Sequence, residues 1–256
     1  MSIWSSPLQP APLVNLVTYP QLQLVATVDQ QGLIKVWKAE TGWEWASFCL
    51  PTSCSAVEAC DHPEGSFLLV ACAEGTLYTL TVPQLQVVSK VTLFPSPFVS
   101  LLCSPDRQWL FASAHNSDLV FPQVFYTQSL LHPSEDELPV STTLTVRLSS
   151  KACWAPDEAA RLIVIESQSV FLFEKAQQMA SFLLPDAMMP PHLMQSHGSQ
   201  VILLTSGSEL VLLTIHGLQL EAFQDHQKPI TALWVVSAAC PAPAMLSCRS
   251  PHRGLT

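Results

Sequence analysis

Residues 29–42 read DQQGLIKVWKAETG, and this stretch decides the fold class. Its apolar segment, Leu33–Trp37, lies between two turn signals, Gln30–Gly32 and Glu40–Gly42. Short apolar segments bounded by glycine-containing turns are typical of strands joined by tight hairpins. The stretch therefore predicts a strand inside a small antiparallel sheet over residues 12–50. The other three strands of that sheet are predicted at Val14–Thr18, Leu22–Val28 and Trp43–Phe48.

The same order of apolar segments and turns recurs along the chain. A repeat of about 40 to 45 residues is typical of a β-propeller, in which each repeat forms one four-stranded blade. The sequence thus predicts an all-β propeller over residues 1–236, with about five blades and an incomplete or open ring. The blades are predicted at residues 12–50, 55–93, 98–131, 151–184 and 191–223, followed by a single inner strand at 228–236.

Two regions depart from the repeat pattern. In the third repeat, Pro122 and a charged insert at His132–Pro139 interrupt the apolar segments. Segments rich in charge and proline usually form solvated loops. After Val236 the apolar alternation stops, so residues 237–256 are predicted to be a disordered tail.

Composition limits the classes of function. The formal charge is −9 with only 11 Lys and Arg, which disfavours a nucleic-acid partner because such affinity depends on clustered cations. Met1–Ala11 lacks a secretory pattern, and polar residues interrupt the most apolar stretch, Val201–Ile215, so no membrane anchor is predicted. The eight cysteines form no C-x-x-C pair. We therefore interpret them as buried structural thiols. This predicts a reducing, intracellular compartment, either the cytoplasm or the nucleus.

No residue pattern indicates catalysis, a cofactor or a metal. His192 with His197, and His62 with Glu64, come nearest to metal-ligand spacing, but neither pair has supporting ligands. The nucleophile elbow, the Walker A loop and the dinucleotide fingerprint do not occur in the sequence. The chain is therefore predicted not to be an enzyme, and a propeller hydrolase ranks last among the alternatives.

Residues 29–42 resemble the turn, third strand and exit of a WD40 repeat. Gly32, Trp37 and Gly42 fall on motif positions, while Lys38 replaces the usual aspartate. Residues 225–233, DHQKPITAL, resemble the Gly-His opening of such a repeat, with Asp225 in the glycine position and His226 on the histidine. The resemblance implies structural roles for these five motif residues.

WD repeats often hold a buried hydrogen-bonded set of Asp, His, Ser or Thr, and Trp within one blade. The resemblance implies such a set here only in part, because Trp37 and His226 lie in different repeats and Gln31 stands where the aspartate is expected. Incomplete satisfaction of buried polar groups is expected to loosen a blade.

The sequence as a whole, over about residues 1–236, resembles the WD region of the F-box/WD repeat-containing family. The resemblance rests on Ile3–Pro7, Ile34–Trp37, Ser89–Thr92, Pro122–Phe125, Ser129–Leu131, Pro133–Glu135, Asp225–Gln227 and Trp234–Val235. It implies a propeller that presents substrate and an F-box that binds the Skp1 adaptor of cullin–RING ubiquitin ligases. No Leu-Pro-led amphipathic helical segment precedes the repeats, so the expectation is a truncated product that does not bind Skp1.

Protein recognition is the expected function, and a structural scaffold or a non-functional truncated isoform is the alternative. Trp43 and Trp45 on a predicted outer strand are candidate partner contacts because large aromatics dominate interface energetics, although burial between blades is the more frequent outcome. Glu135, Asp136 and Glu137 in the insert form either a solvated loop or an acidic docking or phosphorylation loop.

Overall fold

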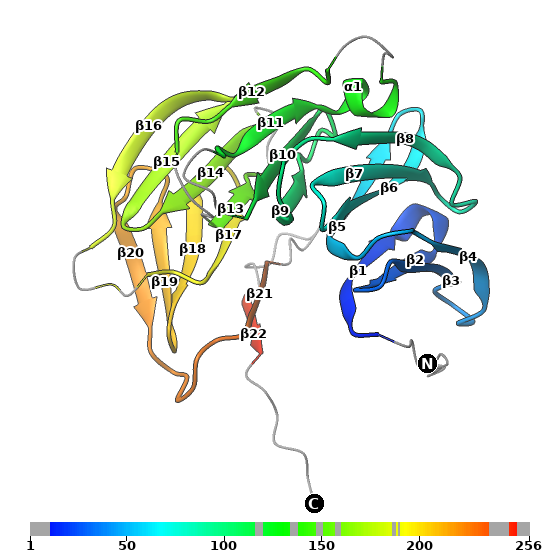
Figure 1. Cartoon of the computed structure of the whole chain (residues 1–256). Coiled ribbons are helices and arrows are strands. Elements are labelled where there is room, and N and C mark those ends of the chain that lie inside the picture. Colours follow the sequence, from blue (N-terminus) through cyan, green and yellow to red (C-terminus); the bar gives the residue numbers. More distant parts are fainter. Residues whose placement is uncertain are drawn as a thin grey trace, which may run out of the picture. The chain divides into compact units, whose positions relative to one another are not determined.

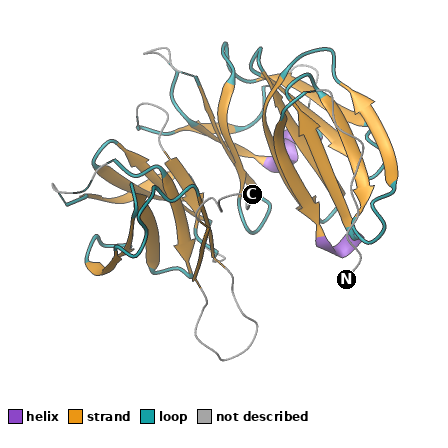
Figure 2. Ribbon diagram, turned by 90° about the horizontal axis from the view of Figure 1, so that it is seen from below, coloured by secondary structure: helices purple, strands orange, loops and turns teal. Residues whose placement is uncertain are grey.

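The computed structural model describes residues 11–115, 120–133, 138–146, 151–156, 160–185, 188 and 190–235, together with the backbone of Leu246–Arg249. The chain divides into two compact units, Met1–Ser149 and Ser150–Thr256. Antiparallel strands dominate both units (Figure 2). None of the helices in these residues is long and apolar enough to cross a membrane.

The first unit contains three four-stranded antiparallel sheets (Figure 1). The first sheet is β1 (Leu13–Tyr19), β2 (Leu24–Asp29), β3 (Leu33–Lys38) and β4 (Glu44–Cys49). The second is β5 (Cys54–His62), β6 (Gly65–Cys72), β7 (Thr76–Thr81) and β8 (Val87–Thr92). The third is β9 (Phe98–Cys103), β10 (Trp109–Ala114), β11 (Gln123–Tyr126) and β12 (Ser141–Thr143), with helix α1 (Thr127–Leu131) between its last two strands. Neighbours in each sheet are neighbours in the sequence, so every sheet is a simple meander.

The second unit contains two further four-stranded sheets and one two-stranded sheet. The fourth sheet is β13 (Lys151–Trp154), β14 (Arg161–Glu166), β15 (Ser169–Glu174) and β16 (Gln177–Leu183). The fifth is β17 (Leu193–His197), β18 (Val201–Ser206), β19 (Glu209–Thr214) and β20 (Gln219–Phe223). The two-stranded sheet is β21 (Ala232–Val235) with β22 (Leu246–Arg249). The all-β class and the five four-stranded sheets confirm the prediction from the repeat.

Strand β6 explains why some strands are apolar without alternation. Successive side chains of a strand point to opposite faces of the sheet. Leu68 and Val70 pack in the core shared with the first sheet, whereas Leu69 and Ala71 pack in the core shared with the third. Because both faces are covered, a run such as Phe67–Cys72 is buried throughout. The fourth and fifth sheets share a core in the same way.

The turn between β2 and β3 requires glycine. Gly32 has φ +88°, a conformation that side chains disfavour, and a Cβ there would lie 2.6 Å from the Thr52 carbonyl oxygen. The amide of Gly32 bonds to the carbonyl of Asp29, which closes the turn. Gly42, in the turn before β4, also has a positive φ, of 70°. Both glycines thus serve the turns that the sequence predicts.

The structure corrects the third repeat. Its fourth strand is β12, which lies beyond the predicted end of the blade at residue 131 and beyond the charged insert. Three exposed residues, Ser141–Thr143, give no apolar signal, which is why the sequence does not reveal the strand. Pro122 does not disrupt the sheet, because it precedes β11 and its carbonyl accepts the amide of Leu144.

The structure also corrects the last predicted strand. β21 lies within residues 228–236, but it is not unpaired, since it pairs antiparallel with β22. β22 falls in the segment 237–256, for which the sequence predicts disorder, and the remaining residues of that segment lie outside those described. The backbone N–H and C=O groups of a strand favour pairing with another strand, which explains why β21 has a partner. A single propeller domain over residues 1–236 stays a prediction.

Candidate protein-binding surface

Two sets of buried polar groups lie in the first sheet, one at Trp37 and one at Asp29. The side chain of Trp37 is 3% exposed on β3, and its indole Nε1 donates a hydrogen bond of 3.0 Å to Thr27 Oγ1 on β2. Asp29, fully buried at the end of β2, accepts the amides of Gln31 and Leu33 at 3.0 and 2.9 Å through Oδ1. The turn aspartate is therefore Asp29, which the sequence analysis missed in favour of position 31. The signal was present, since Asp-x-x-Gly is typical of an aspartate that caps a turn.

Asp225 and His226 lie in the second unit, in the loop between β20 and β21. Asp225 is exposed and His226 is half-buried. The loop returns to the fifth sheet at Ile230, whose amide bonds to the carbonyl of Gly207 and whose side chain is buried. The motif role of Asp225 and His226 stays a prediction.

Trp43 and Trp45 lie at the outer rim of the first sheet. The sheet order β1-β2-β3-β4 puts β4 at an edge, and the two indoles are 75% and 52% exposed. Burial between blades, the more frequent outcome for such residues, is therefore wrong here. Ala46 and Phe48 on the same strand pack against the core of the first and second sheets, whereas the two indoles face solvent. Two exposed tryptophans only two residues apart form an apolar patch, and such patches often mark sites of protein interaction.

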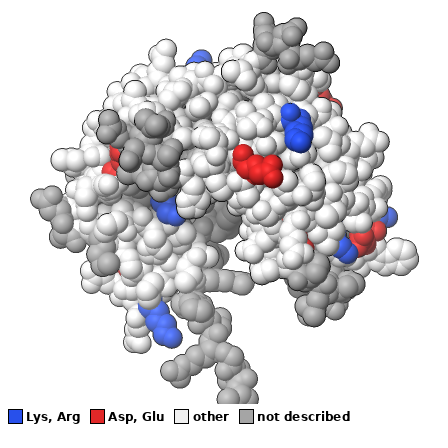
Figure 3. Space-filling model, viewed as in Figure 1, with Lys and Arg blue, Asp and Glu red and all other residues white. Residues whose placement is uncertain are grey.

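Three charged side chains fix the surroundings of these indoles. Lys38 Nζ lies 4.8 Å from the centre of the Trp45 ring, a cation–π contact. Lys35 Nζ lies 2.7 Å from Glu44 Oε2, and this hydrogen bond lowers the pKa of Glu44. Figure 3 shows basic and acidic side chains side by side where Figure 1 places β3 and β4. The surface around Trp43 and Trp45 therefore combines two exposed apolar rings with the Lys35–Glu44 ion pair.

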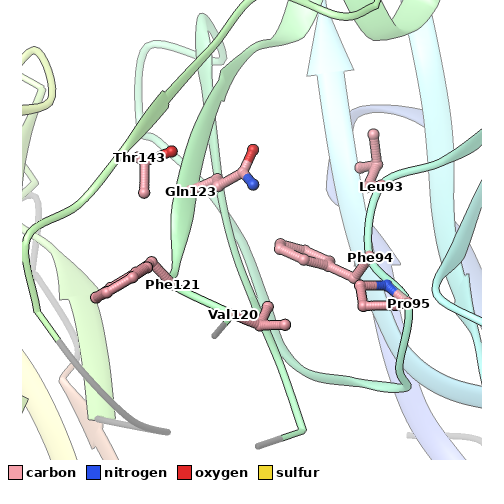
Figure 4. Close-up of a pocket in the computed structure, with 7 residues that line it drawn as sticks. All are labelled: Leu93, Phe94, Pro95, Val120, Phe121, Gln123 and Thr143. Carbon is pink, nitrogen blue, oxygen red and sulfur yellow. The ribbon is translucent and has the colours of Figure 1, made fainter. Parts of the chain in front are cut away.

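A cleft of about 430 Å³ lies elsewhere in the first unit, between the loop after β8 and strands β11 and β12. Phe94 forms one wall and is held edge-on against Phe98 and Phe125, at centroid distances of 5.1 and 6.3 Å. The ring of Phe94 and the amide of Gln123 point toward one another from opposite sides (Figure 4). The remaining lining residues are Leu93, Pro95, Val120, Phe121 and Thr143. This cleft could not be predicted from the sequence, because its walls come from segments far apart in the chain.

The acidic candidates Glu135, Asp136 and Glu137 lie outside the described residues, so their docking role stays a prediction. The start of their insert is tethered to the second sheet. Glu64, in the turn between β5 and β6, accepts a hydrogen bond of 2.9 Å from Gln128 Nε2 and contacts His132 Nε2. These two partners lower the pKa of Glu64.

In the two pairs with near-ligand spacing, His192 and His62 contact backbone groups. His192 Nε2 lies 2.7 Å from the Ile230 carbonyl oxygen, and His62 Nδ1 accepts the amide of Glu64 at 3.4 Å. Within the described ranges no group of three or more His, Cys, Asp or Glu side chains is arranged to hold a metal ion.

The sequence of the chain was compared with protein families and with curated proteins. No protein-family model matches the chain. It is 38% identical over 251 residues to F-box/WD repeat-containing protein 12 of Homo sapiens, which covers 91% of this chain and 54% of that protein. The sequence of the chain is thus similar to that of the F-box/WD repeat-containing proteins. The chain is also 31% identical over 240 residues to F-box/WD repeat-containing protein 15 of Mus musculus, and this match covers 86% of the chain and 51% of that protein. The chain spans about half the length of these curated relatives.

Solved structures of other proteins share the fold of this chain. A chain of the crystal structure titled mitotic checkpoint complex aligns with a TM-score of 0.64 at 12% identity, covering 82% of this chain and 64% of that one. Saccharomyces cerevisiae Sqt1 aligns with a TM-score of 0.68 at 14% identity, covering 90% and 66%. At such identities the likeness concerns the fold alone. It confirms the WD40-type β-propeller class predicted from residues 29–42.

Proposed function

We propose that this chain is a non-catalytic protein-interaction module that holds its partner on the outer strand β4. The observation that carries the proposal is the exposure of Trp43 and Trp45, at 75% and 52%. With about 250 Å² for a whole tryptophan, the two rings offer a partner roughly 300 Å² of surface. Aromatic anchors of this kind are enriched among hot spots, whose truncation costs at least about 2 kcal/mol of binding free energy.

The sequence similarity supports a more specific role. F-box/WD proteins join a ligase-docking element to a substrate-presenting propeller, and the proposed role of this chain is the second one: to hold a protein destined for ubiquitylation. The exposed rings of Trp45 on β4 and of Trp43 directly before it, together with the Lys35–Glu44 pair, suit a folded protein surface. The ligase adaptor Skp1 is not expected to bind these 256 residues directly. Binding of purified Skp1 to the purified chain at low micromolar concentration would overturn that part of the proposal.

The proposed place of action is inside the cell, in the cytoplasm or nucleus. The six cysteines in the described part of the chain are free thiols, and five of them are buried. Buried reduced cysteines suit a reducing compartment. Fractionation of cells that express the tagged chain tests this placement.

Quantitative proximity labelling tests the interaction surface. Three tagged chains are compared in the same cells: wild type, the double variant Trp43→Ala with Trp45→Ala, and the control Trp234→Ala. Trp234 is 70% exposed on β21, so the control removes an equally exposed indole from a different sheet. At least one labelled protein should fall about tenfold or more with the double variant and stay unchanged with the control.

The protein identified in this way is then purified, and its affinity for the three chains is measured by calorimetry. Direct binding that is lost only in the double variant supports the β4 surface. A set of labelled proteins that is identical for all three chains would refute it and favour a scaffold role instead.

A further inference from the structure

Strand β16 is an unprotected sheet edge. It is the outermost strand of the order β13-β14-β15-β16, and Figure 1 shows it at the rim of the fourth sheet. Its seven residues, QQMASFL, include neither a charge nor a proline. Native proteins usually protect edge strands with charges, prolines or short length. In the part of the chain that the structure describes, no strand pairs with the outer side of β16.

The other outer strands carry the protection that β16 lacks. β4 contains Glu44, β8 contains Lys90 and β20 contains Glu221. β12 is only three residues long. The β15–β16 pair has one bulge, between Leu172 and Phe173, but the other three long outer pairs have a bulge as well. The absence of charge is therefore what distinguishes β16 from its equivalents.

The hydrogen-bond register fixes which backbone groups face outward. Leu184 donates its amide to the Gln168 carbonyl at 2.7 Å, so the positions that bond to β15 alternate backwards from residue 184. Ala180 and Phe182 bond inward, opposite Leu172 and Val170. The N–H and C=O groups of the intervening residues, 181 and 183, point away from the sheet toward the open edge.

Phe182 anchors this edge to the core, and two other side chains leave its surface apolar. Phe182 packs against the core of the fourth and fifth sheets, and its ring lies so close to Gly217 that a Cβ there would fall 2.6 Å from it. Leu183 is 73% exposed and Met179 is 65% exposed. Register and twist are thus set from inside, while the outer groups are ready to pair.

We propose that β16 pairs antiparallel with β16 of a second copy of this chain. In such a two-fold contact the same strand lies on both sides, so a charge near its centre would meet its own like charge. Lys90 in β8 or Glu221 in β20 would meet this repulsion, and β16 has no charge to repel. Residues 181 and 183 of one copy then bond to residues 183 and 181 of the other about an axis at Phe182, so the pairing involves the C-terminal end of β16. The pairing is independent of the proposed β4 surface.

Analytical ultracentrifugation of the full chain tests the pairing. Wild type is expected to change from monomer to dimer between low micromolar and a few hundred micromolar. Ser181→Lys places a charge on an exposed position of the edge and should weaken the dimer about tenfold or more. The control Thr142→Lys, on the exposed strand β12, should leave the dimer unchanged. A monomer at every concentration overturns the proposal, as does a dimer that Ser181→Lys does not weaken.

Two further samples connect dimerisation to the pairing itself. Ser181→Pro removes the outward N–H without adding charge, and the inward bonds survive because residue 181 does not bond to β15. It should abolish the dimer while the melting temperature of the monomer stays close to that of wild type. An equimolar mixture of Ser181→Lys and Ser181→Glu should recover a heterodimer. Failure of this mixture to associate, with both variants folded, would contradict pairing through β16.

Discussion

Glu58 gives the sharpest test of how the sheets pack, because this half-buried residue lies on the strand that contacts the third sheet. It lies on β5, next to β9 of the third sheet. Burial raises its pKa to about 7, while a hydrogen bond from the Cys103 backbone and the charge of Arg107 act in the opposite direction. The variant Glu58→Gln keeps the shape of the side chain and removes its ability to ionise.

The sign of the effect follows from where the proton binds more tightly. The folded chain has the higher pKa, so Glu58 stabilises the fold at low pH, and this contribution is lost as the pH rises from the unfolded value of about 4.5 through the folded value of about 7. A shift of this size corresponds to about 3 kcal/mol. Glu58→Gln should therefore gain under about 1 kcal/mol near pH 5 and about 3 kcal/mol near pH 8, relative to wild type.

Urea unfolding followed by circular dichroism over this pH range measures the difference. Glu44→Gln is the matched control, because the hydrogen bond from Lys35 lowers the pKa of Glu44. Its contribution has the opposite sign: it is present above the unfolded pKa of Glu44 and is lost as the pH falls through the lowered value. A stability gain from Glu58→Gln that is the same near pH 5 and near pH 8 would refute the raised pKa of Glu58 at the contact of β5 with β9.

Two further substitutions test the turn and the polar network of the first sheet. Trp37→Phe removes the donor of the 3.0 Å hydrogen bond to Thr27 and should cost about 1 to 2 kcal/mol in urea unfolding, and an unchanged midpoint would contradict the role of this bond. Gly32→Ala should cost more than about 1 kcal/mol, because φ is +88° and the new Cβ would meet the Thr52 carbonyl. Gly198→Ala is its control in thermal melts, since a Cβ at Gly198 meets nothing within 4 Å, and equal losses for the two variants would contradict the steric argument.

The fold could be predicted where short-range signals agree. The segment Leu33–Trp37 lies within β3 because glycine turns and apolar residues mark the same boundaries. β12 could not be predicted, because three exposed residues bury nothing and leave no pattern. β22 could not be predicted either, since its partner β21 lies across a segment without apolar alternation.

The candidate surface could be predicted only in part. Trp43 and Trp45 are visible in the sequence, but their exposure depends on β4 being the last strand of its sheet, which is a property of sheet order. The apolar edge of β16 is invisible for the same reason, since an uncharged strand reads alike at the centre and at the rim. A buried hydrogen bond at Trp37 could be predicted from the WD-repeat motif. The turn aspartate, Asp29, could not, because the spacing of the motif placed it at position 31.

Site-specific photo-crosslinking tests protein binding at β4 at the level of single residues. The amino acid p-benzoylphenylalanine is placed at Trp43, with Trp45 retained, and in a separate chain at Thr142 on β12 as the control. Irradiation in cells should attach a discrete protein to position 43 and none of that protein to position 142. Equal adducts at the two positions, or none at position 43 while the chain remains folded, would contradict protein binding at β4.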